Sequence, residues 1–389
     1  MAFALYVHIP YCQAKCPYCD FNSYAAQHWP EDRYVGALSS EINHYAQCAP
    51  FSGNEISTVF FGGGTPSLFT PESIKRILDT AFTLWRAEDT SALEITLEAN
   101  PGTVTLEKLC GFRAAGVNRM SFGVQSFHAH HLRSLGRIHN AAEAVAAVDL
   151  ARQAGFDNVS IDLIFGLPEQ TLEEWEMDLA RAGGMSPNHV SAYNLTYEEG
   201  TPFHKLRTQG VLRQLPEETE VAMFTRPREL LAAAGYEQYE ISNYAQPGHR
   251  CRHNLNYWHS GDYLGLGAGA HSYARGRDAL ETGDFGRRWS NEKLPAAYVE
   301  SVERHGHART CSEDLDVRRA RGEFVFLGLR CLDGFAATEF RQRFGADLPA
   351  LFPHVQDLAD GGLLHLTDDR CKLTSRGLLL ADSVFVTFL

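Results

Sequence analysis

Short apolar runs alternate with amphipathic segments along the first half of the chain. The apolar runs are rich in β-branched and aromatic residues, and they predict strands at residues 5–10, 56–64, 93–101, 117–126, 159–168 and 189–196. The intervening segments follow the period of a helix and predict helices at residues 31–48, 71–85, 106–114, 141–154 and 172–182. Several of these helices follow a residue that favours helix N-caps: Thr70, Thr105, Asn140 and Thr171.

Uniformly apolar strands that alternate with helices are typical of a parallel sheet covered by helices. A complete TIM barrel needs eight such strand–helix units, and six are visible in this sequence. We therefore predict an α/β fold built on a partial, open, TIM-like (β/α)6 barrel. A doubly wound sheet remains the alternative, because the order of the strands cannot be read from their spacing.

The alternating pattern loosens after about residue 202. A helix is expected at residues 217–234, and the segment at 251–273 is rich in glycine and aromatic residues. From about residue 314 the sequence predicts short helices and a hairpin with its turn at residues 367–369, as in a small, mostly helical winged-helix-like domain. We expect a core at 1–202, a barrel extension at 203–300 and a C-terminal domain at 310–389.

Polar and glycine-rich clusters stand where the predicted strands end. The second strand runs into GGGTP at residues 62–66, the third carries Glu98, the fourth ends near Gln125 and the fifth contains Asp162. In parallel α/β folds the carboxyl ends of the strands form the functional face. Glycine and proline are explained by turns alone, but acids inside apolar runs are not. The pattern predicts one shared site at this edge.

Composition and charge narrow the classes of function. The chain has 389 residues and a net charge of −13, which argues against a nucleic-acid partner. Its start, MAFALYVHIP, lacks the features of a signal peptide, and no apolar run is long enough to span a bilayer, so we expect a cytoplasmic protein. Peripheral membrane association and the choice between monomer and homodimer stay open. Nine cysteines without a secretion signal indicate metal or redox chemistry rather than disulfides.

Three cysteines follow the first predicted strand within YVHIPYCQAKCPYCDFNSY: Cys12, Cys16 and Cys19. A closed zinc site needs four ligands, yet the next residues are Asp20 and Phe21. A [4Fe–4S] cluster can be held by three thiolates if a small molecule with an amine and a carboxylate binds the fourth iron. The alternatives are a zinc site that takes a distant Cys or His, and three structural thiols.

The cysteine spacing resembles the CxxxCxxC signature of radical S-adenosylmethionine (SAM) proteins. More widely, the chain resembles the oxygen-independent coproporphyrinogen III oxidase-like family of radical SAM proteins, through YVHIPYC, CPYCDF, FFGGGTPSL, LEANPG, GVNRMSFGVQSF, LGRIH, IDLIFGLPEQT and RHNLNYW. The resemblance implies a [4Fe–4S] cluster on the three cysteines, with SAM bound to it. It also implies the residues of the SAM pocket: Tyr6 beside the methionyl group, Gly63, Gly64 and Thr65 where the backbone approaches SAM, Glu98 on the ribose, and Gln125, Arg137 and Asp162 along the wall.

The family has an oxidase branch and a haem-chaperone branch. The oxidase, which decarboxylates coproporphyrinogen III, carries a fourth cysteine in CxxxCxxCxC and a long extension before the motif. Here Phe21 stands in place of that cysteine, and only eleven residues precede Cys12. The haem-chaperone branch carries CxxxCxxCxF and an HNxxYW motif, and this chain has both. The resemblance therefore favours the second branch.

The HNxxYW motif at residues 253–258 is the expected haem site. The resemblance implies that His253 ligates the iron of haem b, since neutral imidazole is a good axial ligand, and that Tyr257 and Trp258 lie against the macrocycle. Cys251 is a rival ligand, and the plain alternative is a hydrogen-bonded core histidine. We expect a haem chaperone that delivers haem to acceptors such as respiratory haem proteins. The alternative is a radical SAM coproporphyrinogen III oxidase, and no catalytic residue is assigned.

Overall fold

The structure, a computed structural model, describes residues 2–86 and 93–389. Within these ranges the main sheet has 12 strands. Six parallel strands form its centre: β1 (Ala2–Ile9), β4 (Glu55–Gly63), β5 (Glu94–Ala99), β6 (Arg119–Gln125), β7 (Asn158–Phe165) and β8 (His189–Asn194). These six strands lie side by side in chain order, whereas a doubly wound sheet would reverse its strand order at a switch point. The barrel-type prediction is confirmed.

Further strands extend the sheet on both sides. Next to β1 lie β11 (Tyr263–Leu266), β12 (His271–Ala274), β13 (Arg287–Asn291) and β14 (Arg309–Asp314). Next to β8 lie β10 (Asn243–Ala245) and β9 (Glu237–Glu240). The pair β1–β11 is parallel, and the remaining added pairs are antiparallel. Within the described residues, the outer strands β14 and β9 are not paired with each other.

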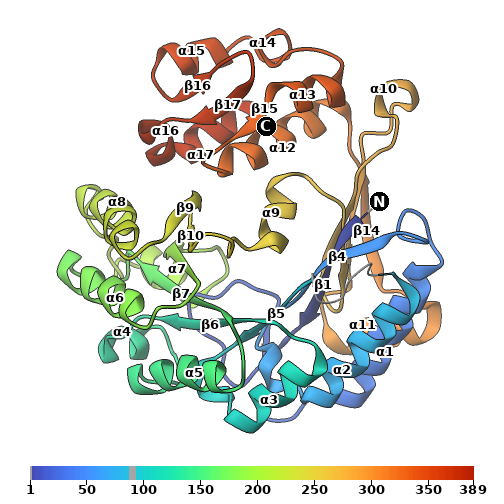
Figure 1. Cartoon of the computed structure of the whole chain (residues 1–389), viewed down its shortest axis with the longest axis vertical. Coiled ribbons are helices and arrows are strands. Elements are labelled where there is room, and N and C mark those ends of the chain that lie inside the picture. The colour runs from blue at the N-terminus through green and yellow to red at the C-terminus, as the bar shows by residue number, and fades with distance from the viewer. Residues whose placement is uncertain (1, 87–92) are drawn as a thin grey trace.

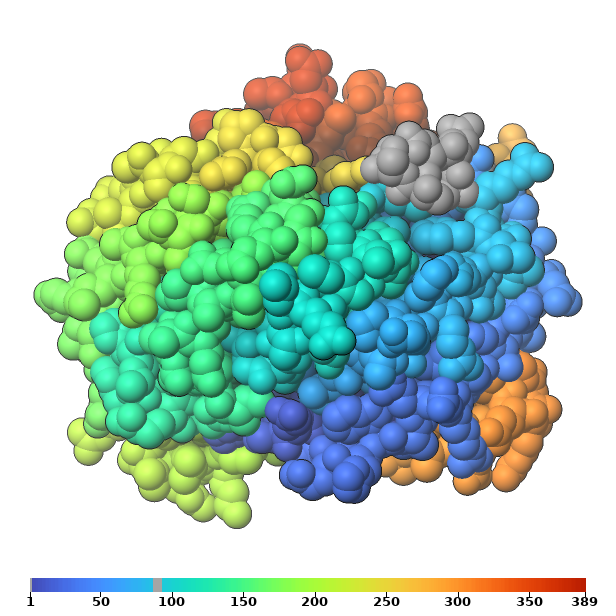
Figure 2. Space-filling model, turned by 60° about the horizontal axis from the view of Figure 1, so that its bottom comes forward, coloured from blue at the N-terminus to red at the C-terminus, as the bar shows by residue number. Residues whose placement is uncertain are grey.

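Helices cover the outer face of the parallel strands (Figure 1), and Figure 2 shows the surface of the molecule from the side that is at the bottom of Figure 1. These helices are α1 (Glu31–Ala46), α2 (Pro71–Leu84), α3 (Leu106–Ala115), α4 (Ala129–Ser134), α5 (Ala141–Gln153), α6 (Leu172–Gly184), α8 (Glu217–Ala233) and α11 (Pro295–His305). Helix α7 (Pro202–Thr208) lies against the cysteine loop instead, where the backbone N–H of Phe203 donates to the oxygen of Pro17. The predicted caps are confirmed, because the side chains of Thr70, Thr105, Asn140 and Thr171 each accept a backbone N–H in the first turn. The short helix α4 was not predicted.

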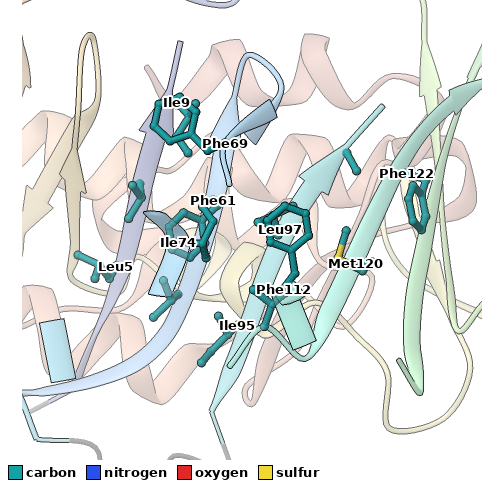
Figure 3. Close-up of a cluster of buried hydrophobic side chains, with 14 of the residues drawn as sticks. Leu5, Ile9, Phe61, Phe69, Ile74, Ile95, Leu97, Phe112, Met120 and Phe122 are labelled. Carbon is teal, nitrogen blue, oxygen red and sulfur yellow. The ribbon is translucent and has the colours of Figure 1, made fainter. Parts of the chain in front are cut away.

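The main core lies between the parallel strands and these helices. Figure 3 shows Leu97 of β5 and Met120 of β6 beside Phe112 of α3, and all three side chains are fully buried. Burial of this kind is the main stabilising contribution, at about 1.5–3 kcal/mol for each large apolar side chain. The core holds the strands in place through their outer face, so their carboxyl ends can carry polar groups.

The C-terminal segment has a second core. It contains α12 (Val317–Arg330), β15 (Phe335–Ala336), α13 (Ala337–Phe344), α14 (Leu348–Leu351), α15 (Val355–Asp360), β16 (Leu364–Leu366), β17 (Arg370–Leu373), α16 (Ser375–Leu379) and α17 (Ala381–Phe385). Its three strands pair in the order β15-β17-β16, and the hairpin turn is at the predicted place. This mostly helical unit with one small sheet agrees with the winged-helix-like prediction.

Helix α9 (Arg252–Trp258) lies between the barrel and the C-terminal unit (Figure 1). The remaining short elements are β2 (Tyr11–Cys12), β3 (Tyr24–Ala25) and α10 (Ala279–Thr282). Among the helices of the described ranges, none has the length and apolar character needed to cross a membrane.

Candidate cofactor site at the carboxyl edge of the barrel

The three clustered cysteines lie on the loop that follows β1. Their thiols are free and partly exposed, and all three residues line one cavity of about 950 Å³. Lys15 holds the loop closed, because its Nζ donates to the backbone oxygens of Phe21 at 2.7 Å and Ser23 at 2.9 Å. The loop therefore presents its three sulfur atoms to a single space.

Each of the three sulfur atoms has its own hydrogen-bond partner. The Thr65 hydroxyl donates to Cys12 Sγ at 3.5 Å, and Arg137 Nη1 donates to Cys16 Sγ at 3.5 Å. The Ser23 hydroxyl lies 3.8 Å from Cys19 Sγ. Donors of this kind orient thiolate ligands and tune the reduction potential of an iron–sulfur cluster. The loop is thus prepared for three thiolates.

The spacing of the sulfur atoms argues against a single metal ion. Sulfur donors around one zinc ion, with Zn–S bonds of about 2.3 Å, lie roughly 3.8 Å apart. In the described part of the chain, the one set of three or more ligand atoms that lie within 4.8 Å of one another is His130, His131 and Glu174. The three sulfurs are therefore too widely spaced for one ion, whereas a cluster with several iron atoms suits them.

Most of the predicted SAM residues line the same cavity as the cysteines. They are Gly63, Gly64, Thr65, Glu98, Gln125, Arg137 and Asp162. They come from the carboxyl ends of β4, β5, β6 and β7 and from the loop after α4, so the fold brings together residues that the sequence scatters over a hundred positions. Tyr6 is different: it lines a smaller neighbouring cavity of about 210 Å³, which shares Glu98 and Asp162 with the larger one.

The two glycines have a packing role in addition to the one that the sequence indicated. We expected Gly63 and Gly64 to let the backbone approach SAM. At Gly63, where φ is +108°, a Cβ would lie 2.3 Å from the His8 ring, and at Gly64 it would lie 2.6 Å from the backbone oxygen of Tyr11. Both residues are glycine because β1 and its cysteine loop pack directly against the end of β4.

Two acids face each other at the base of the cavity. Burial and the neighbouring Asp162 raise the pKa of Glu98 to about 8, and burial also raises the pKa of Asp162. The backbone N–H of Gly63 and the charge of Arg119 partly offset the effect on Glu98. Perturbed carboxyl groups in a cavity indicate a functional site. A bound sulfonium cation and ribose hydroxyl donors would both favour the ionised acid.

Arg137 joins the end of β6 to the cysteine loop. Its Nη2 donates to the Gly123 oxygen at 2.7 Å while Nη1 contacts Cys16, and its buried Nε has no hydrogen-bond partner among the described residues. Gln125 adopts a left-handed backbone, with φ at +70°, which is uncommon for a residue other than glycine. Strain and an unpaired donor at one cavity wall are features of ligand sites.

The HNxxYW motif lies on α9, near the amino ends of the strands, and its His253 and Tyr257 line the smaller cavity together with Tyr6. His253 is fully buried, its Nδ1 lies 2.8 Å from the hydroxyl of Thr58, and its Nε2 lies 2.9 Å from the hydroxyl of Tyr257. Both ring nitrogens are therefore engaged, as in the core-histidine alternative. In this arrangement Nε2 can reach haem iron only if Tyr257 moves away, and Nδ1 only if Thr58 does.

Other contacts fix α9 in place. Glu94, at the start of β5, accepts the backbone N–H groups of Arg252 at 3.1 Å and His253 at 2.9 Å, so it caps the helix. Burial and the neighbouring Glu94 raise the pKa of the rival ligand Cys251 to about 12, which disfavours a thiolate. The Trp258 ring lies 4.3 Å from the guanidinium of Arg330 on α12, and this contact joins α9 to the C-terminal unit.

Some residues of the cofactor cavity and of the surroundings of α9 were not identified from the sequence. Lys15 and Ser23 are ordinary loop residues whose partners depend on how the loop closes. Glu94 had a signal, because it shares its strand face with Glu98 at the two-residue period and is also an acid inside an apolar run. Arg119, a fully buried cation next to Asp162 and Glu94, had a similar signal at the start of β6.

Apolar side chains form the mouth of the large cavity. Leu379 and Leu380 of the C-terminal unit are each 42% exposed, and Val221 of α8 is 38% exposed. The cations on the cavity wall are Arg137 and Arg330, and acids outnumber them: Asp20, Glu98, Asp162, Glu198, Glu217, Glu220 and Asp382. The cavity thus joins an acidic, thiol-bearing interior to an apolar rim.

Comparison with known proteins places these features in a wider group. The model of the radical SAM superfamily matches residues 6–182, and that of the HemN C-terminal domain matches residues 315–380. Heme chaperone HemW of Bacillus subtilis (strain 168) is 37% identical over 99% of this chain and 98% of its own length. Heme chaperone HemW of Escherichia coli (strain K12) is 38% identical over 99% and 98%.

A solved structure extends this similarity to the whole fold. Coproporphyrinogen III oxidase (HemN) from Escherichia coli, a radical SAM enzyme, superposes with a TM-score of 0.82 at 25% identity, covering 99% of this chain and 89% of that one. Both the barrel and the C-terminal unit therefore have counterparts in one known protein.

Proposed function

Because the chain belongs to the HemW family of radical SAM proteins, we propose that it is a haem chaperone that binds haem b and passes it to acceptor haem proteins, such as those of respiration. The observation that carries the proposal is identity of 37–38% along nearly the full length of curated relatives named for this function. Membership of the radical SAM superfamily implies a [4Fe–4S] cluster and SAM as cofactors.

The residues at the carboxyl edge fit these two cofactors. Cys12, Cys16 and Cys19 would hold three irons and leave the fourth to SAM. When bound, the cluster supplies one-electron chemistry toward SAM. The chain's own groups have simpler tasks: Glu98 would accept the ribose hydroxyls, and Arg137 holds the Cys16 sulfur in position.

Two features support the chaperone over the oxidase. Phe21, which stands in place of the oxidase's fourth cysteine, is 65% exposed at the cavity. The cavity wall is also predominantly acidic. Coproporphyrinogen III carries more carboxylates than haem, so the same wall would repel it more strongly. Haem can keep its propionates in solvent and present only an apolar edge to the protein.

The apolar mouth is the surface that we propose for haem. A macrocycle gains affinity from apolar area, and Val221, Leu379 and Leu380 offer such area to solvent at the cavity that holds the cysteines. His253, Tyr257 and Trp258 remain the alternative site, but using His253 as a ligand would cost one of its two hydrogen bonds. An exposed site also suits a carrier that must release its cargo.

The test measures haem transfer and the decarboxylation of coproporphyrinogen III in parallel. Cluster-loaded protein is charged with haem under anaerobic conditions and mixed with the haem-free form of a respiratory b-type cytochrome. We expect the haem spectrum to become that of the acceptor, at a rate above that of free haem. In parallel, protein with SAM, reductant and coproporphyrinogen III should release no CO₂. Stoichiometric CO₂ release without haem transfer would establish the oxidase instead.

A further inference from the structure

A cluster of histidines on the outer surface plays no part in the proposed function. The segment FHAHHL places His128 directly before α4 and His130 and His131 within it. Facing them is Glu174, in the first turn of α6. The Nε2 atom of His130 lies 3.1 Å from Glu174 Oε1, and that of His131 lies 3.2 Å from Oε2. Two imidazoles and one carboxylate thus converge on one point.

The distances suit a metal ion. The ligand atoms of His130, His131 and Glu174 all lie within 4.8 Å of one another. In a tetrahedral zinc site with bonds of about 2.0–2.2 Å, the donors lie roughly 3.3–3.6 Å apart. An ion would therefore need small shifts of the two rings away from the carboxylate. Two imidazoles with one carboxylate are a ligand set typical of zinc, with water in the fourth position.

Neighbouring groups hold the carboxylate in place before any ion binds. The backbone N–H of Thr171 donates to Glu174 Oε2 at 3.0 Å within the capping box of α6. The Nε2 of His128 lies 3.1 Å from the backbone oxygen of Glu174, which ties the start of α4 to α6. Outer contacts of this kind preorganise a metal ligand and raise its affinity.

The two histidines of the cluster differ in their exposure to solvent. His131 is buried, with 2% of its side chain exposed, whereas 54% of the His130 side chain is exposed. An ion could therefore enter from solvent past His130 and retain a water ligand on that side. A simple helix–helix contact through paired His–Glu hydrogen bonds is the competing explanation, and it requires no ion.

We propose that His130, His131 and Glu174 form a binding site for a divalent zinc-like cation that bridges α4 and α6. This site is independent of the proposed function. It lies on the outer helices, and its ligands are nitrogen and oxygen atoms rather than thiolates. Its occupation would fix α4, which precedes Arg137 of the cluster site by a few residues.

The experiment is a titration of Zn²⁺ into the cluster-loaded, full-length protein by calorimetry under anaerobic conditions. The loaded cluster occupies the three thiols that would otherwise bind zinc. We expect one saturable site in wild type, with affinity at least tenfold lower in His130→Ala and in Glu174→Gln. Glutamine preserves the shape and the capping box of α6, so a loss there reports on the ligand charge rather than on folding.

His365→Ala is the matched control, because His365 is an exposed histidine on β16 outside this cluster. This variant should bind Zn²⁺ like wild type. Absence of a saturable site in wild type, or unchanged affinity in both His130→Ala and Glu174→Gln, would overturn the proposal and leave the His–Glu contact as a purely structural link between the helices.

Discussion

The two edges of the parallel barrel differ in how far their polar groups are hydrogen-bonded within the protein. At the carboxyl edge, three free thiols, a buried and unpaired Arg137 Nε and acids of raised pKa face a cavity. At the amino edge, Glu94 and Thr58 satisfy the backbone and side chain of α9, and His253 has no exposed surface. The carboxyl edge opens on a large cavity that bears thiols, whereas at the amino edge both ring nitrogens of His253 are hydrogen-bonded, although Arg119 Nε and Trp258 Nε1 also lack a hydrogen-bond partner among the described residues.

The contrast between the two edges shows when a short sequence motif marks a ligand site. Both CxxxCxxC and HNxxYW fit family patterns, but a ligand site needs groups whose hydrogen-bonding or coordinating capacity is still available. The cysteine loop meets that condition. Helix α9 instead joins the strand starts to the C-terminal unit, through Glu94 on one side and Arg330 on the other. In barrels of this type the amino edge commonly contributes to stability and the carboxyl edge to function.

The largest effect is expected at the cysteine loop. Cys16→Ser removes one of three cluster ligands and leaves no protein thiol to replace it, so iron content should fall from about four atoms per chain to nearly none. Iron analysis and the visible absorption of the reconstituted protein measure the change. Cys110→Ser, at an exposed thiol on α3, is the control and should keep its iron. A fully loaded Cys16→Ser variant would contradict the cluster assignment.

At the amino edge the expected effect is on stability rather than on cofactors. Glu94→Ala leaves two backbone donors of α9 without a partner and the buried charge of Arg119 less compensated. The free energy of unfolding should drop by about 2–4 kcal/mol, while iron content stays at the wild-type level. Urea titration measures this change. Glu107→Ala, in the exposed first turn of α3, should cost no more than about 1 kcal/mol. Similar losses in both variants would remove the distinction between the edges.

A smaller effect is expected on SAM affinity. Glu98→Gln keeps the size of the side chain but replaces a charged acceptor, and hydrogen bonds to charged groups contribute about 1.5–3 kcal/mol. SAM should therefore bind roughly 10- to 100-fold more weakly, with the cluster intact. Calorimetry with cluster-loaded protein gives the affinity. Wild-type affinity in this variant would mean that the ribose lies elsewhere.

The pH dependence of SAM binding sharpens the same assignment. Since the pKa of Glu98 is raised to about 8, the acid is mostly protonated at neutral pH and becomes ionised as pH rises through 8. SAM favours the ionised form of Glu98, so the affinity for SAM should rise by several-fold between pH 7 and pH 9. Near neutral pH, binding of SAM should release the Glu98 proton to the buffer. The Glu98→Gln variant should show a smaller rise over this range, due only to the amino group of SAM, which also titrates near pH 8. An affinity that falls with rising pH would contradict the role of Glu98.

Elements with a regular hydrophobic period were predictable from the sequence. Elements that depend on contacts between distant residues were not. The six parallel strands and the caps at Thr70 and Asn140 follow from local patterns, and the structure ends the strands one to three residues earlier than predicted. The short strands β9 to β14 lack such a pattern, since pairing with neighbouring strands, outward from β8 and β1, defines them.

The same division holds for the candidate sites. Polar residues at strand ends revealed most of the cavity wall, because parallel strands bring their carboxyl ends together. The position of His253 depended on Thr58, which lies 195 residues away in sequence, and the purpose of Gly63 depended on the ring of His8. No local pattern contains such contacts. The cluster at His130 and His131 escaped attention because its carboxylate belongs to another helix.

The central claim is that haem uses the apolar mouth of the cofactor cavity and not the buried motif on α9. The most direct test is haem titration of cluster-loaded wild type, Leu380→Glu and His253→Ala, with Leu84→Glu as the control at a similarly exposed leucine on α2. Leu380→Glu should bind haem at least tenfold more weakly, while Leu84→Glu binds like wild type. His253→Ala should lose stability but keep the wild-type Soret band and affinity. A changed Soret band in His253→Ala, together with unchanged binding in Leu380→Glu, would contradict the claim and place haem on α9.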